Sequence, residues 1–305
     1  MKQIIYLFAT LLLLNSNNAQ TTDCGTNDPA LPVILGGPAC DQTINYAPDE
    51  LTDVKYVRIT FHVIQDNLGN GNIPNNNAGQ QFLLVDVMNS MNNVMRNMSA
   101  MNLPTTSPYF EDSKIEFVVE NFFFHQNTYL WDFNFQNNMN NPLAVVKGNL
   151  LYNQYVTTNP AIVDKTNSIH VFIIGNMGQI FQGFAYGSTY MVMPSYEQFL
   201  VGDFWNPARL LRHELLHNLG LPHTWSGDNC ADTPNNPNCW NYNTPCCGQP
   251  NTGQCLVWSN NMMDYNAART ALTECQLGIV HSNLVKNVAI NKLVANDYCN
   301  KNGVR

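Results

Sequence analysis

The sequence is poor in charged side chains, and the basic sign is the rarer one. Charged residues make up 12% of the 305 positions, and 22 acidic against 14 basic side chains give a formal net charge of -8. A protein that binds nucleic acid or an anionic membrane through its charge needs a basic patch. The composition therefore argues against both of these partners.

Long apolar runs are absent after the first twenty residues. The run from Ile4 to Leu14 follows Lys2 and leads into small and polar residues, which is the pattern of a secretory signal peptide cleaved near Ala19 or Gln20. A membrane-spanning helix needs about 20 apolar residues, so this run is too short. A retained N-terminal anchor is the alternative, but the flanking residues fit cleavage better. We expect residues 1–20 to be a signal peptide and the protein to be secreted, with no membrane span.

Cysteine is missing from the presumed signal, and all nine cysteines follow it. This distribution fits an oxidising, extracellular compartment, where disulfides persist. Seven of the nine lie between Cys230 and Cys299, so we expect the disulfides to stabilise an irregular C-terminal part. Because nine is odd, at least one cysteine is unpaired or bonds to another molecule.

The remaining chain begins with an irregular leader. Residues 21–53 are rich in Pro, Gly, Asp and Asn and have little apolar periodicity. From Val54 onward, apolar residues alternate with polar ones up to Val63, which predicts a half-buried strand. The folded domain is therefore expected over residues 54–305.

Further elements follow at spacings typical of alternating strands and helices. Apolar residues from Leu84 to Met98, many of them methionine, recur at helical spacing and predict an amphipathic helix of about five turns. We interpret the methionines as core residues rather than a soft metal site. Strands are expected at Ile115–Val119, at Ser168–Ile174 with both faces buried, and at Phe184–Met193. Together these elements predict a layer of partly parallel strands with helices.

The segment from Asn206 to His223 reads NPARLLRHELLHNLGLPH and carries the clearest chemical signal. Asn206 suits a helix N-cap, Pro207 the first helical position and Gly220 a left-handed terminus, so a helix is predicted over about residues 207–219. His213 and His217 are four residues apart on one helical face and can bind one ion.

Gly220 should turn the chain so that His223 returns to the same ion as a third ligand. Three neutral imidazoles leave a fourth zinc position for water, the arrangement of a catalytic zinc site. Zinc lowers the pKa of such a water, and the neighbouring Glu214 can accept its proton during attack on a carbonyl. Histidines without a metal, or a zinc site without catalysis, are the alternatives.

With HELLHNLGLPH in place, the sequence resembles the metzincin zinc peptidases, and it is similar to their pappalysin-like family, also called cytophagalysins. Asn261-Met262-Met263-Asp264-Tyr265 is similar to that family's methionine-containing turn. The HTW that ends the motif segment and Cys230-Ala231-Asp232-Thr233-Pro234 also look like that family. The resemblance covers about residues 54–275 and is strongest from Trp205 onward.

This resemblance implies an α+β, metzincin-like catalytic domain of two lobes. A twisted mixed sheet with helices would form the N-terminal lobe, about residues 54–220, and an irregular disulfide-stapled lobe would cover about 221–299. Met263 would lie beneath the metal as a packing base, and Tyr265 would stabilise the oxyanion. The segment Phe184–Met193 would pair with extended substrate.

The same likeness suggests roles for several cysteines. Cys24 would be a latency ligand that fills the fourth zinc position in an inhibitory leader. A local disulfide between Cys24 and Cys40 is the alternative. Cys230 would pair with Cys255, and Cys275 with one of Cys239, Cys246 or Cys247, although spacing alone cannot decide among the pairings.

Other polar residues give weaker signals. Asp228 and Asp232 offer oxygen ligands for calcium in a loop where relatives often bind it, but two aspartates in a polar loop are more often solvated. Four histidines that are isolated in the sequence are expected to serve packing or the surface rather than a metal: His62, His125, His170 and His281.

Taken together, these patterns predict a secreted zinc endopeptidase made as a zymogen and acting on protein or peptide substrates. One zinc ion is the expected cofactor, with calcium as a possible second metal. One alternative is a binding module that keeps a zinc fold without catalysis, which an intact Glu214 argues against. The other is a zinc hydrolase acting on a non-peptide amide, which a closed pocket would favour. The sequence gives neither the cleavage preference nor the oligomeric state.

Overall fold

The computed structural model describes residues 47–102, 107–133, 142–175, 183–195, 207–224, 228–233, 259–264 and 269–295. The expected signal peptide, most of the leader, Cys24 and Cys40 lie outside these residues, so the expectations for them remain predictions. No helix within the described ranges is long and apolar enough to cross a membrane.

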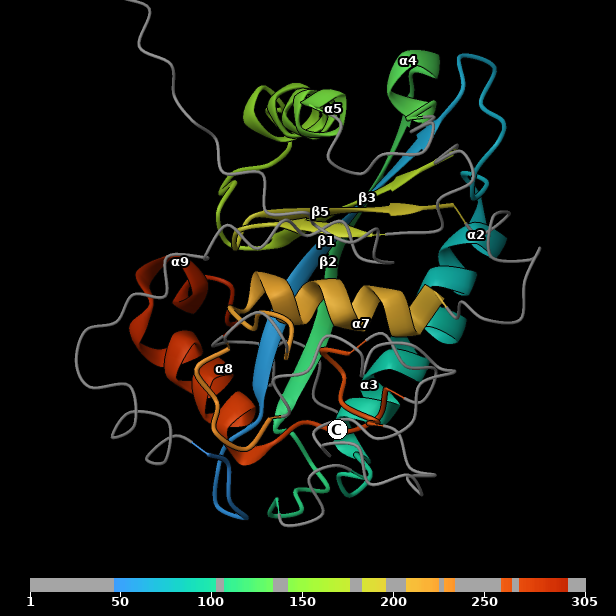
Figure 1. Cartoon of the computed structure of the whole chain (residues 1–305). Coiled ribbons are helices and arrows are strands. Elements are labelled where there is room, and N and C mark those ends of the chain that lie inside the picture. The colour runs from blue at the N-terminus through green and yellow to red at the C-terminus, as the bar shows by residue number, and fades with distance from the viewer. Residues whose placement is uncertain are drawn as a thin grey trace, which may run out of the picture.

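A five-stranded sheet forms the centre of the N-terminal part (Figure 1). Its order is β2-β1-β3-β5-β4, and the pairs β2-β1, β1-β3 and β3-β5 are parallel, whereas β4 pairs antiparallel with β5. The mixed sheet with its helices confirms the expected α+β class. The strands are β1 (Lys55–Gln65), β2 (Ile115–Gln126), β3 (Ile169–Ile174), β4 (Phe184–Tyr186) and β5 (Tyr190–Pro194).

Strand β1 is more deeply buried than its alternating sequence predicts. Every residue from Ile59 to Gln65 is buried, because β2 and β3 flank the strand and apolar layers cover both of its faces. One layer contains Phe61 together with Leu211 of helix α7 (Pro207–Asn218). The other layer contains Ile64 together with Leu151 of helix α5 (Pro142–Tyr152).

The helices lie on opposite sides of the sheet. Figure 1 shows α5 and the short helix α4 (Thr128–Trp131) on one side of β3 and β5, and α7 on the other. Helix α8 (Glu274–Lys286), which the sequence pattern did not reveal, joins the layer of α7 through Leu277, Val280 and Leu284. A short helix, α9 (Val288–Asn291), follows α8.

The methionine-rich segment forms the expected long helix, but its apolar face is shifted near its start. It consists of α2 (Asn77–Gln81), a π-helical stretch η1 (Phe82–Met88) and α3 (Asn89–Arg96). A π-turn inserts one residue per turn relative to an α-helix, so Leu83 is buried, whereas the predicted Leu84 is 37% exposed. A second π-helical stretch, η2 (Asn153–Thr157), follows α5.

The expected strand Phe184–Met193 is a hairpin of two strands. Gly187 has a φ of +49°, a left-handed conformation that glycine adopts without steric cost. The chain therefore reverses between Tyr186 and Tyr190, and β4 becomes an edge strand beside β5.

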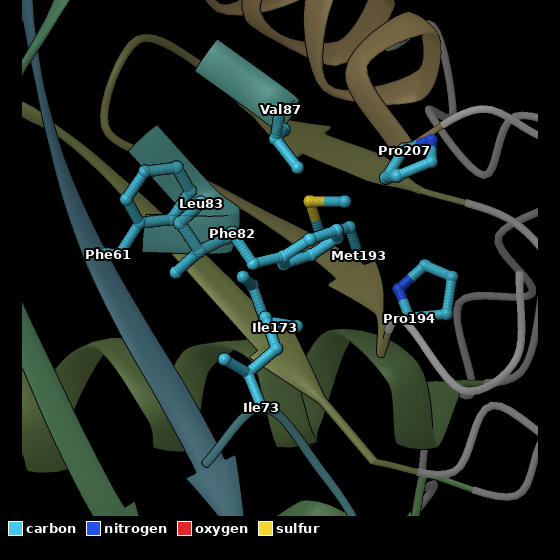
Figure 2. A pocket seen from close by; sticks show the side chains of 9 residues that line it. All are labelled: Phe61, Ile73, Phe82, Leu83, Val87, Ile173, Met193, Pro194 and Pro207. Carbon is cyan, nitrogen blue, oxygen red and sulfur yellow. The ribbon is translucent and has the colours of Figure 1, made fainter. Parts of the chain in front are cut away.

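A narrow apolar gap lies between the sheet, η1 and the start of α7 (Figure 2). A water molecule there would lack the polar partners that ordered buried water needs, so we interpret the gap as a packing defect rather than a binding site. The gap is lined by Phe61, Ile73, Phe82, Leu83, Val87, Ile173, Met193, Pro194 and Pro207.

Three histidines that are distant in the sequence form a hydrogen-bonded chain across β2, β1 and β3. His62 Nδ1 lies 3.0 Å from His125 Nε2, and His62 Nε2 lies 3.0 Å from His170 Nδ1. The chain ends with His170 Nε2 at 3.2 Å from the Lys165 carbonyl oxygen. Because that carbonyl can only accept, His170 donates from Nε2 and its Nδ1 must accept. His62 therefore donates from Nε2 to His170 Nδ1, and His125 donates from Nε2 to His62 Nδ1. This histidine chain (His125, His62, His170) is a packing element, as expected, but its members are not isolated.

One disulfide differs from the predicted pairing. Cys230 bonds to Cys275, so the predicted pair of Cys230 with Cys255 is wrong, as is any pairing of Cys275 with Cys239, Cys246 or Cys247. The physical reason is that Asp232 holds the Cys230 loop on the start of α8. Its carboxylate accepts hydrogen bonds from Thr273 Oγ1 at 2.9 Å and from the Cys275 backbone at 3.2 Å.

Candidate metal centre

Helix α7 brings the first two candidate ligands together. It covers Pro207–Asn218, close to the predicted range, and His213, Glu214 and His217 are all buried within it. Residues four apart share a helical face, and Nε2 of His213 and Nε2 of His217 lie 3.2 Å apart. The spacing in the sequence therefore produces the expected juxtaposition.

The helix ends at Gly220 in a left-handed turn. Gly220 has a φ of +100°, its N–H donates to the His217 carbonyl, and the N–H of Leu221 donates to the Leu216 carbonyl. These two bonds form a Schellman motif, which redirects the chain so that His223 points back at α7. The expected role of this glycine is confirmed.

Replacing Gly220 with alanine is expected to destabilise the protein and its metal site together. A Cβ at this residue would lie 2.3 Å from Asn283 Nδ2, and the positive φ adds strain of about 1–3 kcal/mol. Urea unfolding should show a loss of that size, and zinc should bind more weakly because His223 follows the turn. Unchanged stability and zinc affinity would contradict the role of the turn.

The three imidazoles converge on one point. Nε2 of His223 lies 3.3 Å from Nε2 of His213 and 3.1 Å from Nε2 of His217. On the far side of two of the rings, Nδ1 of His213 lies 2.7 Å from the Met262 carbonyl oxygen and Nδ1 of His217 lies 2.6 Å from that of Leu221. A carbonyl can only accept, so both Nδ1 atoms carry the proton and both Nε2 atoms present lone pairs.

This convergence fits a tetrahedral metal ion. Facing lone pairs repel one another unless a cation lies between them, and a zinc ion with nitrogen ligands at about 2.0–2.1 Å places those ligands about 3.3–3.4 Å apart. Burial, together with His217, Arg269 and His223, lowers the pKa of His213 well below its usual value, which favours the neutral imidazole that a metal requires. These histidines form a candidate metal site.

A turn from the C-terminal part contacts the site through a backbone carbonyl. Met263 is fully buried within it, and the Met263 N–H donates to Asn261 Oδ1 at 2.8 Å. Asn261 is held in turn by Gln276 of α8, whose Oε1 accepts from Asn261 Nδ2 at 2.7 Å. The contact to a ligand histidine comes from the Met262 carbonyl, a role that the sequence reasoning did not assign. The sequence NMMD was the signal from which a contact between this turn and a ligand histidine could have been predicted.

The turn is also tied to the segment that carries His223. Thr224 Oγ1 donates to Asp264 Oδ1, and Asp264 is fully buried, which is the main reason why its pKa rises to about 6. Tyr265, the predicted oxyanion-stabilising residue, lies outside the described residues, so its role remains a prediction.

Glu214 lies on the side of α7 that faces the edge strand. It is fully buried, and the backbone of Gly183, directly before β4, packs against it. A Cβ built on Gly183 would lie 2.7 Å from Glu214 Cγ and 3.0 Å from Oε1. Sequence reasoning did not single out Gly183, because nothing local marks a glycine that touches a helix 31 residues later.

The two candidate calcium ligands act as hydrogen-bond acceptors in the described loop. Asp228 accepts from the Cys230 backbone at 3.0 Å and from Thr233 Oγ1, and burial raises its pKa to about 6. Asp232 holds the start of α8, as described above. Asp232 also lies close to Cys230 and Cys275, but those two sulfurs bond to each other. Internal hydrogen bonding is thus a sufficient role for both aspartates.

Comparisons with known proteins give a likeness in structure but none in sequence. No family model matches the chain, and no curated protein matches its sequence. Among solved structures, the chain is similar to mature mirolysin of Tannerella forsythia in complex with a cleaved peptide, with a TM-score of 0.53. The identity is 15%, and the match covers 79% of this chain and 96% of that chain. This likeness confirms the metzincin-like α+β fold with its mixed sheet.

Proposed function

We propose that this protein is a secreted zinc endopeptidase that hydrolyses peptide bonds with Glu214 as general base. The observation that carries the proposal is the convergence of three imidazole Nε2 atoms at 3.1–3.3 Å. Two of these histidines present lone pairs to the centre, because their Nδ1 protons are engaged by the Met262 and Leu221 carbonyls. A bound cation satisfies this arrangement, because it accepts lone pairs from all three nitrogens.

A zinc ion bound at this site would act as a Lewis acid and would lower the pKa of a bound water toward neutrality. His213, His217 and His223 would hold that ion through their converging Nε2 atoms. Glu214, the neighbour of His213 on the helix, accepts the proton of the attacking water and passes it to the leaving amine. Glu214 is fully buried, and the lower dielectric constant of a buried position strengthens its interaction with the reacting groups. Tyr265 is proposed to stabilise the oxyanion, and Met263 to support the ligands from below.

A peptide substrate is favoured by the position of the edge strand. Strand β4 lies at the end of the sheet and packs on α7, and an edge strand can pair with an extended peptide through its backbone. The solved mirolysin structure, which has the same fold, contains a cleaved peptide. Both observations favour peptide hydrolysis over hydrolysis of a small non-peptide amide.

The finer assignment to the pappalysin-like family rests on short motifs: HTW after the zinc motif, the CADTP segment and the NMMDY turn. We also propose that the leader inhibits the enzyme before activation, with Cys24 as the latency ligand, and that the loop at Asp228 and Asp232 is the place to test for calcium. The likeness in fold bears only on the coarser, metzincin-like assignment.

Removal of the metal is expected to abolish hydrolysis reversibly. Protein without residues 1–20, and a second form without the leader, would be assayed on casein and on a quenched fluorescent peptide library. A zinc chelator should stop cleavage, and stoichiometric zinc should restore it. Without the metal, the three histidines provide no Lewis acid to lower the pKa of the attacking water. The zinc content should be one ion per chain by elemental analysis.

Two outcomes would count against the proposal. Cleavage that resists a chelator after zinc has been shown to leave would contradict the metal mechanism. A protein that binds one zinc ion yet cleaves no peptide after removal of its leader would favour the non-catalytic binding module.

A further inference from the structure

Strand β4 faces helix α7 with the smallest residues of the strand. Side chains alternate between the two faces of a strand, so residues 183 and 185 share one face of β4 and residues 184 and 186 the other. Phe184 and Tyr186 pack in the layer of α5, whereas Ala185 packs in the layer of α7. The face turned to α7 thus carries only Gly183 and Ala185.

Helix α7 meets this face with two polar residues one turn apart. Asn218 Nδ2 donates to the Gly187 and Tyr190 carbonyls, which fixes the β4-β5 turn on the end of the helix. Four residues earlier, Glu214 lies against Gly183. The strand is therefore held at its far end by Asn218 and rests at its near end on the side chain of Glu214.

The contact at Gly183 leaves no room for a side chain. A Cβ there would lie 2.7 Å from Glu214 Cγ, well inside the 3.5–4.0 Å at which two carbon atoms attract each other. The atom met is in the middle of a fully buried side chain, so it cannot move aside into solvent. Either the Glu214 carboxylate or the strand would have to shift.

We infer that Gly183 is a positioning residue for Glu214: the backbone at residue 183 packs directly on the side chain of the general base and fixes where its carboxylate lies. This inference rests on the proposed function, since it assigns Gly183 a role in the placement of the same base. The role assigned to Gly183 is exerted through the side chain of Glu214.

The test is Gly183→Ala, assayed with a fluorogenic peptide cleaved by the wild-type protein. A catalytic group displaced by about 1 Å can lose about 100-fold in rate, so kcat is expected to fall about 10- to 100-fold with little change in KM. The zinc content should stay at one ion per chain, because Gly183 touches none of the three histidines in the contacts above. A rise in KM with unchanged kcat would place the effect on substrate pairing and overturn the inference.

A double-mutant cycle with Glu214→Gln separates a positioning effect from a merely structural one. If Gly183 acts through the base, Gly183→Ala should cause no further loss in the Glu214→Gln background, where glutamine has the same shape but cannot accept the proton. Losses that multiply across the two variants would show that Gly183 acts elsewhere, and would overturn the inference.

Val163→Ala is the control variant, because Val163 is 98% exposed in the loop between η2 and β3 and has no part in the proposed site. This variant removes a side chain that packs on nothing in the core, so it should keep wild-type kcat. A loss equal to that of Gly183→Ala would show that the effect is not specific to Gly183.

If Gly183→Ala does not fold, Asn218→Ala tests the same packing from the other end. It removes both hydrogen bonds that hold the turn on α7, so β4 should pack less tightly against Glu214. We expect kcat to fall and zinc to stay bound. Unchanged kcat in this variant would overturn the inference. A wild-type protein that cleaves no peptide would instead refute the proposed function, and the inference with it.

Discussion

Replacing Glu214 with glutamine is expected to lower kcat by about 100- to 10,000-fold, the usual contribution of a general base. Glutamine has the same shape and can still pack against Gly183, but its amide cannot accept a proton from water. The three histidines are untouched, so the variant should bind one zinc ion with wild-type affinity. Peptide hydrolysis, measured beside zinc titration, checks both expectations.

The matched control for this variant is Glu120→Gln. Glu120 is exposed on β2, so the control makes the same chemical change far from the metal site and should keep wild-type kcat. If Glu214→Gln retains full activity with zinc bound, another group must accept the proton. If it loses zinc as well as activity, Glu214 has a structural role in the site, and the assignment as general base would no longer follow from the loss.

Acidification between pH 6.5 and about 4 is expected to destabilise the protein through the histidine chain. Burial lowers the pKa of His125 and of His170 to about 4, and it lowers that of His62 well below its usual value. In the unfolded chain these imidazoles bind protons near pH 6.5, so the unfolded state takes up more protons across this range. The stability that the neutral histidine chain contributes is therefore fully present above pH 6.5 and is lost as the pH falls from 6.5 toward 4.

The expected loss is large. The shift of His170 alone corresponds to about 3 kcal/mol at pH 4. The rings that stack on the chain exclude the water that would solvate a charged imidazole: Phe123 and Phe172 stack on His62, and Tyr155 stacks on His125 with ring centroids 3.8 Å apart. The positive charge of Lys165 further lowers the pKa of His170.

His62→Gln tests this expectation within the same hydrogen-bond pattern. The glutamine oxygen can accept from His125 and its amide can donate to His170, but the side chain does not titrate. The stability lost between pH 7 and pH 5 should shrink by about 2 kcal/mol, the contribution of one histidine that stays neutral in the folded state. Urea unfolding at the two pH values, with chelator present throughout, would measure it. Parallel pH curves for variant and wild type would contradict the role of His62.

Much of the candidate metal centre could be read from the sequence because its geometry is local. The spacing of His213 and His217 is converted into contact by the helix itself, and Gly220 is the kind of residue that a left-handed helix end requires. The strands were found through their apolar patterns, but the burial of β1 on both faces was not, since alternation looks the same whether the polar face meets water or a histidine chain.

The apolar pattern of the sequence also failed to predict two details, the π-helical stretch and the β4-β5 hairpin. The π-helical stretch moved the buried position from Leu84 to Leu83, because periodicity assumes the α-helical repeat. The segment from Phe184 to Met193 forms a hairpin that turns at Gly187. The residues Gly187-Ser188-Thr189 were a turn signal that the expectation of a single strand overlooked.

By itself, the sequence determined the histidine motif, the helix that carries it and the turn that returns His223, since each depends on residues within about a dozen positions of one another. Only the tertiary structure decided the contacts between distant segments. These include the Cys230–Cys275 disulfide, the Met262 carbonyl behind His213, the histidine chain and the packing of Gly183 on Glu214. The physical reason is that local geometry follows from backbone conformation, whereas such contacts depend on how the sheet, α7 and α8 stack on one another, which no short pattern encodes.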